Sequence, residues 1–195
     1  EIVSSQQDQS CFQSVRELVH DVQLHGYYGG VRLVKATIKT FVEYCQRQEI
    51  VLHDRNFAVR YTSNIPRAVG LAGSSAIIVA TLRALMEFYE VQIPRRVQPS
   101  LVLKVETGEL GITAGLQDRV IQVYGGMVAM DFGHDSIESC EGFECGDYRR
   151  LDPSLLPRLY VAYSSDAGEP TEVFHNRLRE RFDQGEPQVL SAMER

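Results

Sequence analysis

The sequence predicts an α+β fold in which helices dominate and short strands lie between them. Segments with one apolar face at helical spacing occupy most of the chain. Strand-like runs occur singly, without the regular strand-helix alternation that favours a doubly wound parallel sheet. With 195 residues, the chain is long enough for one sizeable core, or for one domain and part of another.

The N-terminal third is expected to hold two amphipathic helices and a strand. Residues 10–25 place apolar side chains on one face, and Gly26 follows where a helix would end. Residues 30–48 repeat this pattern, with basic side chains on the other face. Apolar and other residues alternate over 57–62, which predicts a half-buried strand.

The middle of the chain predicts three further helices. Residues 76–89 are nearly all apolar, so this helix should be deeply buried. Two prolines precede a helix over 101–110, and a shorter helix over 116–124 ends at a pair of glycines.

The C-terminal part predicts strands at 127–132 and 159–163 and a charged helix over 171–182. The polar stretch 133–152 carries few apolar residues and is expected to be a linker.

Composition excludes several classes of function. The net charge is -6 and no basic patch is visible, which argues against a nucleic-acid partner. No run approaches the roughly 20 apolar residues that cross a bilayer, so no membrane partner is expected. The four cysteines form no CxxC pair, which favours reduced thiols and a cytoplasmic location over a zinc site or disulfides.

The most informative segment is residues 64–80, where two glycines and two serines precede the apolar helix. Gly70 and Gly73 would let the backbone turn sharply and approach a ligand closely. Ser74 and Ser75 stand where the helix begins and its first amides lack internal partners, which suits a phosphate. No lysine follows the second glycine, so this is not a Walker A loop. The alternative is an ordinary tight turn with a serine cap.

Two carboxylates, Glu106 and Asp118, are separated by a glycine-rich connection that could bring them into one cleft. Phosphoryl transfer needs acids that hold Mg²⁺, donors that hold the phosphates and a carboxylate facing the attacking hydroxyl. The alternative is that both acids are surface charges at helix ends.

The segment 66–76 resembles the P-x-x-x-G-L-[GA]-G-S-S-A signature of the GHMP small-molecule kinases. The resemblance implies ATP and Mg²⁺ as cofactors. It implies that Ser75 and Glu106 share the metal and that Asp118 is the catalytic base, or orients the acceptor hydroxyl, a role worth roughly 10²- to 10⁴-fold in rate. The residues implied to bind the nucleotide are Pro66, Gly70, Leu71, Ala72, Gly73, Ser74, Ser75 and Ala76.

Within these kinases the strings at 27–36, 111–120 and 122–132 look most like the glucuronokinase branch. The resemblance covers residues 27–132 and implies transfer of the ATP γ-phosphate to the anomeric hydroxyl of glucuronate. Other acceptors (galactose, galacturonate, a heptose or mevalonate), a related decarboxylase and a nucleotide-binding regulator that has lost catalysis stay open. Asp118 would contact the sugar. Arg119 would pair with the sugar carboxylate or, alternatively, with a neighbouring acid.

The resemblance also implies an arrangement of lobes. Residues 1–150 would form the ATP-binding N-terminal lobe, similar to ribosomal protein S5, without the first motif of the family. Residues 151–195 would begin a ferredoxin-like C-terminal lobe, without the third motif. We therefore expect that this piece does not turn over alone.

Overall fold

The computed structural model describes residues 12–25, 31–66, 70–163, 178 and 180–193. Most of the predicted helix 171–182 and part of the glycine-rich loop, residues 67–69, lie outside them. The elements are α1 (Val15–His25), α2 (Arg32–Arg47), α3 (Gly73–Phe88), α4 (Gln98–Lys104), the π-helical turn η1 (Val105–Glu109), α5 (Leu116–Tyr124), β1 (Met127–Asp131), the 3₁₀ turn η2 (His134–Ser136), β2 (Glu138–Cys140), β3 (Phe143–Cys145), β4 (Asp147–Leu151), the 3₁₀ turn η3 (Pro153–Leu155) and α7 (Pro187–Met193).

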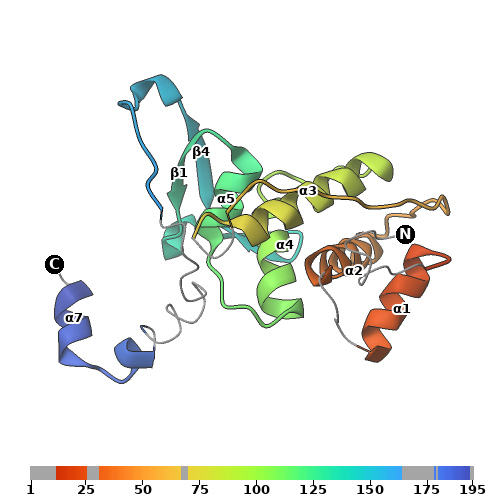
Figure 1. Cartoon of the computed structure of the whole chain (residues 1–195), viewed down its shortest axis with the longest axis horizontal. Coiled ribbons are helices and arrows are strands. Elements are labelled where there is room, and N and C mark those ends of the chain that lie inside the picture. The colour runs from red at the N-terminus through yellow and green to blue at the C-terminus, as the bar shows by residue number, and fades with distance from the viewer. Residues whose placement is uncertain (1–11, 26–30, 67–69, 164–177, 179, 194–195) are drawn as a thin grey trace.

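The helices α2, α3, α4 and α5 pack together at the centre of the molecule (Figure 1). Helix α1 lies against α2 on one side, and the β1–β4 ribbon continues from α5 on the other. Helix α7 lies apart from the central helices, near the C-terminus (Figure 1). The predicted mixture of helices and strands is confirmed. No helix in the described parts of the chain has the length and apolar character that crossing a membrane requires.

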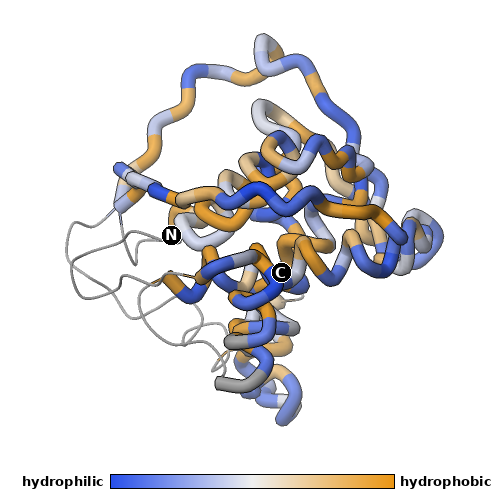
Figure 2. Tube along the Cα trace, turned by 90° about the vertical axis from the view of Figure 1, so that its right-hand side faces the viewer, coloured by the Kyte–Doolittle hydropathy of each residue, from blue (hydrophilic) through white to orange (hydrophobic). Residues whose placement is uncertain are grey.

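The core forms where α2 and α3 bury their apolar faces against each other. Ile38 and Phe41 of α2 and Ile78 of α3 are fully buried. Phe41 also stacks on Tyr89, with 5.7 Å between the ring centroids. Hydrophobic and hydrophilic residues recur turn by turn along the helices (Figure 2), as the sequence pattern predicts.

Helices α2 and α3 end in the same way, although the sequence offers no glycine at either end. Glu49 and Glu90 both adopt the left-handed conformation with φ 57°. The amide that follows each glutamate then donates back into the helix, from Ile50 to the Cys45 carbonyl (2.8 Å) and from Val91 to the Met86 carbonyl (2.9 Å). This Schellman geometry satisfies carbonyls that a helix end otherwise leaves free.

The predicted linker at 133–152 is wrong, because this stretch folds. Strand β4 pairs antiparallel with β1, from Met127 opposite Leu151 to Asp131 opposite Asp147. Strands β2 and β3 form an antiparallel hairpin. The stretch is polar overall, but Phe143, Cys145 and Tyr148 fall on inward positions and are buried.

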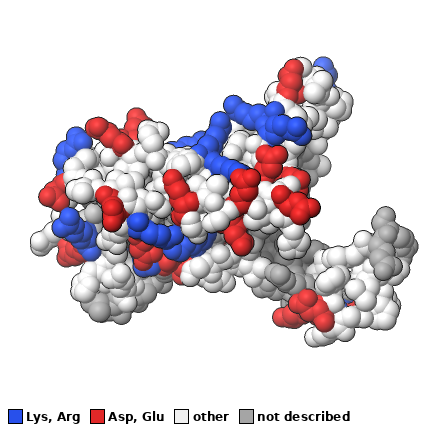
Figure 3. All heavy atoms as spheres, turned by 180° about the vertical axis from the view of Figure 1, so that it is seen from behind, with Lys and Arg blue, Asp and Glu red and all other residues white. Residues whose placement is uncertain are grey.

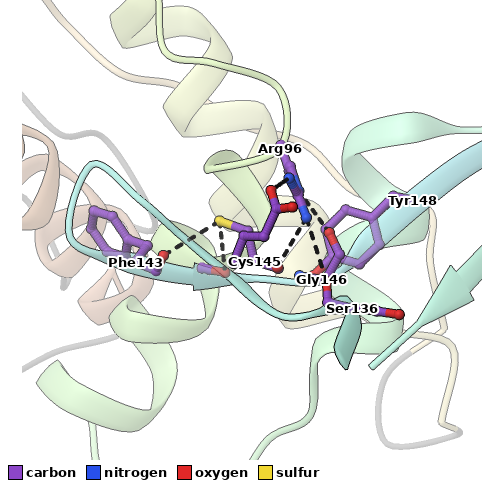
Figure 4. Close-up of polar contacts among 8 residues, drawn as sticks. Arg96, Ser136, Phe143, Cys145, Gly146 and Tyr148 are labelled. Carbon is purple, nitrogen blue, oxygen red and sulfur yellow. Dashed lines mark hydrogen bonds and ion pairs between the residues drawn. The ribbon is translucent and has the colours of Figure 1, made fainter. Parts of the chain in front are cut away.

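Arg96, from the turn before α4, fastens this hairpin to the helices (Figure 4). Its Nε donates to the Gly146 carbonyl at 2.8 Å, and its Nη2 donates to the carbonyls of Ser136 (3.5 Å) and Cys145 (3.3 Å). It also forms an ion pair with Glu138. We call Arg96 and these four partners the Arg96 cluster.

The predicted strands at 57–62 and 159–163 are also wrong. Both segments belong to no strand of either sheet, and only Val59 makes a bridge. The second is strongly exposed, with Tyr160 83% accessible. A segment with alternating apolar residues pairs into a sheet only where a second strand lies beside it. The described residues place no second strand beside either of these segments.

Candidate active site

The turn before α3 is made by two residues in the left-handed region. Gly70 has φ 74°, and Ala72, which caps the helix, has φ 53°. Gly73 is already helical, and a Cβ placed on it would make an ordinary contact of 3.6 Å with Ile65. The sharp turn expected at Gly70 and Gly73 therefore lies at Gly70 and Ala72.

The start of α3 presents backbone donors that the helix itself does not use. The amide of Ala76 is the first to join the helical ladder, donating to the Ala72 carbonyl at 3.1 Å. Helix geometry leaves the amides of Gly73, Ser74 and Ser75 without an intrahelical acceptor. The first turn of α3 carries no acidic side chain, so its positive end suits an anion.

The two serines at this helix start differ in what they contact. Ser75 is fully buried, and its hydroxyl donates to the Ala72 carbonyl at 3.0 Å. The Ser74 hydroxyl donates to Glu106 Oε1 at 2.7 Å. The structure thus brings Ser74 to the predicted metal-binding acid, and the metal role of Ser75 stays a prediction.

Glu106 lies in the π-helical turn η1 and is fully buried. Its Oε2 accepts a hydrogen bond from Arg119 Nε at 2.5 Å and forms an ion pair with Arg119 Nη2. A buried carboxylate is stable only when it is paired and hydrogen-bonded, and here a serine and an arginine meet both needs.

Arg119 joins the two predicted acids. It lies in the first half of α5 and is only 6% exposed. Its Nη1 donates to the Gly115 carbonyl at 3.0 Å and to Asp118 Oδ2 at 3.3 Å. The Asp118 side chain is 54% exposed and therefore open to a ligand. We call Ser74, Glu106, Asp118 and Arg119 the acid–arginine network.

Lys39 ties the π-helical turn to α2. Its Nζ lies 2.7 Å from Glu109 Oε2 and 2.8 Å from Glu43 Oε1. Burial lowers the pKa of Lys39 and the hydrogen bonds to Glu109 and Glu43 raise it, with a net rise. The lysine therefore stays charged and holds η1, and with it Glu106, against the core.

The network fits Mg²⁺ in the kind of donor it offers. Mg²⁺ prefers oxygen ligands and is commonly held by one or two carboxylates together with substrate phosphates. The Glu106 carboxylate and a serine hydroxyl stand beside a helix end that suits phosphate. The described residues contain no group of three or more His, Cys, Asp or Glu side chains that could hold a metal ion. The remaining ligands would come from the nucleotide and from water.

Residues 32–126 match the family model of the GHMP kinases N terminal domain. Over these residues, just under half of the chain, the sequence is that of a GHMP kinase N-terminal domain. The matched range contains the loop before α3 and the whole acid–arginine network. The resemblance drawn from the sequence is thereby confirmed.

Two curated relatives are glucuronokinases of Arabidopsis thaliana. Glucuronokinase 1 is 46% identical over 184 residues and Probable glucuronokinase 2 is 45% identical over 185, in each case 93% of this chain and 49% of the relative. The D-glycero-alpha-D-manno-heptose 7-phosphate kinase of Campylobacter jejuni is 30% identical over 77 residues, 40% of this chain and 23% of that protein. The chain thus spans about half the length of the glucuronokinases that it matches. No solved structure matches it significantly.

Proposed function

We propose that the protein is an ATP-dependent sugar-acid kinase that phosphorylates the anomeric hydroxyl of glucuronate, giving glucuronate 1-phosphate. The observation that carries this proposal is the acid–arginine network at the anion-binding start of α3. The GHMP kinase domain supports phosphoryl transfer, and the similarity to two glucuronokinases supports the uronic acid.

In this proposal, the start of α3 holds the ATP phosphates. The amides of Gly73, Ser74 and Ser75 donate to phosphate oxygens, and the helix dipole adds to the attraction. Pro66, Gly70, Leu71, Ala72 and Ala76 shape the loop around these donors. Glu106 and the serine hydroxyls, that of Ser75 included, would hold Mg²⁺, which would neutralise charge on the phosphates.

Asp118 faces the acceptor. Its exposed carboxylate accepts the proton of the anomeric hydroxyl as that oxygen bonds to the γ-phosphorus. The bond between the γ-phosphorus and the β,γ-bridging oxygen breaks, so ADP leaves with the bonding electrons. The predicted contact of Arg119 with the sugar carboxylate would compete with Glu106, because both acids need the same guanidinium.

An acceptor panel on the full-length protein tests the proposal. ATP consumption is measured with glucuronate, galacturonate, glucose, galactose, a heptose phosphate and mevalonate. We expect glucuronate to give the highest kcat/KM, and Asp118→Asn to lower kcat by about 100-fold or more. Asp135→Asn, in the exposed turn η2, is the matched control and should keep the full rate.

Three results would contradict the proposal. Equal rates with glucose and glucuronate would indicate a neutral sugar. A full rate in Asp118→Asn would remove Asp118 from the mechanism. Binding of ATP without consumption of any acceptor would indicate a regulator in place of an enzyme.

A further inference from the structure

We propose that Arg119 makes metal binding at Glu106 depend on the nucleotide, because its guanidinium holds the carboxylate that a divalent cation would otherwise take. This proposal rests on the proposed function, since it concerns the same acid. It gives Arg119 the role of a positioning residue that acts through Glu106.

The first support is that the metal-binding acid already has a cation. Glu106 is fully buried, and both of its carboxylate oxygens are engaged, Oε1 by Ser74 and Oε2 by Arg119. The guanidinium is itself almost completely buried, so water screens this pair little. Arginine does not deprotonate in proteins, so the competition persists at every working pH.

The second support is that the guanidinium has other acceptors in place. Its Nη1 already donates to the Gly115 carbonyl and to Asp118. Arg119 can therefore release Glu106 and stay beside Asp118 with part of its hydrogen bonding intact.

The third support is the charge balance. The acids Glu106 and Asp118 share one guanidinium, so the network carries about one excess negative charge when both are ionised. One buried carboxylate with a bound arginine is a poor site for a free divalent ion, which would meet the guanidinium's repulsion. Nucleotide phosphates add negative charge and ligands at the start of α3, and these favour the cation over the arginine.

Mn²⁺ binding to the full chain tests this inference without any turnover. Affinity is measured by electron paramagnetic resonance with and without ADP, for wild type, Arg119→Met and Arg119→Lys. Wild type should bind Mn²⁺ weakly alone and at least about tenfold more tightly with ADP. Arg119→Met should bind Mn²⁺ alone at least about tenfold more tightly than wild type, because the competing charge is gone. Arg96→Met is the matched control, because this arginine binds mainly carbonyls, and it should leave the affinity unchanged.

Unchanged nucleotide-free affinity in a folded Arg119→Met would overturn the inference. If Arg119→Met does not fold, Arg119→Lys decides. Its compact ammonium cannot hold both acids at once, so it should tighten nucleotide-free Mn²⁺ binding by about threefold or more, and wild-type affinity in this variant would equally overturn the inference. Failure of the proposed function looks different: the full-length wild-type protein would then phosphorylate no uronic acid, whatever the Mn²⁺ affinities of the variants.

Discussion

Arg119 and Arg96 both tie together segments that are far apart in the sequence, but they do so through different acceptors. Arg119 is buried and binds two carboxylates, those of Glu106 and Asp118. Arg96 is more exposed and binds three backbone carbonyls, with one exposed carboxylate, that of Glu138, at the edge. Arg95 resembles Arg96, because it donates to the carbonyls of Val123 and Tyr124 at the end of α5.

The difference separates arginines that stabilise the fold from one that can respond to a ligand. A carbonyl carries no net charge, so its contact with a guanidinium is not displaced by a cation in the way that a carboxylate's is. Basic and acidic side chains are interspersed over the rear surface (Figure 3), so the particular acceptors of each arginine distinguish these regions better than the overall surface charge does.

The largest effect should follow from removal of the buried acid. Glu106→Gln leaves Arg119 buried without its full counter-charge, so the free energy of unfolding should fall by about 3 kcal/mol or more. Urea denaturation of the variant and of wild type measures this. A fall in the free energy of unfolding as small as that expected for removal of an exposed acid would contradict the proposed difference between Arg119 and Arg96.

Removal of the second arginine should destabilise the protein without changing its chemistry. Arg96→Met leaves the carbonyls of Gly146 and Cys145 without their guanidinium partner, so the melting temperature should fall by roughly 4–8 °C. The kcat and KM of the folded variant should stay within about twofold of wild type, because no residue of the Arg96 cluster belongs to the proposed site. A large fall in kcat at a temperature where the variant is folded would contradict this separation.

The elements around these arginines were not equally predictable. The helices α1 to α5 follow from apolar periodicity, and α5 lies at the predicted residues 116–124. The strands within 133–152 were not predicted because most residues of this stretch are polar. The few apolar residues that point inward, Phe143 and Cys145 among them, do not stand out in such a sequence. The strands predicted at 57–62 and 159–163 failed because a pattern in one segment does not reveal whether a partner strand lies beside it.

The candidate site was predictable in its parts but not in its connections. Glycines and serines before an apolar helix, with two acids downstream, indicated an anion site with carboxylates. The sequence could not show that Ser74, and not Ser75, reaches Glu106. Which serine does so depends on the left-handed conformation of Ala72 and on the direction in which η1 turns the Glu106 side chain. The sequence left two interpretations of Arg119: it could pair with the sugar carboxylate or with a neighbouring acid. In the structure it pairs with a neighbouring acid, Asp118.

Thiol reactivity should report the packing around the Arg96 cluster. Burial raises the pKa of Cys145, and it raises the pKa of Cys45 from 9.0 to about 12, whereas Cys140 is partly exposed. Of these three thiols, iodoacetamide at pH 8 should therefore modify Cys140 first, at least about tenfold faster than the other two. Peptide mass spectrometry measures each rate, and Arg96→Met should speed the modification of Cys145 more than that of Cys45. Equal rates at Cys140 and Cys145 would show that the hairpin does not protect its thiol.

The same burial sets the direction of a pH effect. Because the pKa of Cys45 is higher in the folded protein, its contribution to stability is complete below about pH 9 and is lost as the pH rises toward about 12. Stability in a Cys45→Ala variant should depend less on pH over that range.

The smallest effect should come from the exposed acid of the Arg96 cluster. Glu138→Gln removes a partly solvated ion pair and leaves the carbonyl contacts of Arg96 in place, so the melting temperature should change by about 1 °C or less. A shift as large as that of Glu106→Gln would show that the ion pair, and not the carbonyl contacts, holds the hairpin.

The π-helical turn η1 sets the rotation of Glu106 about the helix axis relative to the segment that leads on to α5. An α-helix advances about 100° per residue, and a π-helical turn fits one residue more into a turn than an α-helix does. Deleting Thr107 would straighten the helix and rotate Glu106 relative to the segment that follows, although no side chain of the network is altered. The distance along the chain between Glu106 and Arg119 is therefore as much a part of the site as the two side chains themselves.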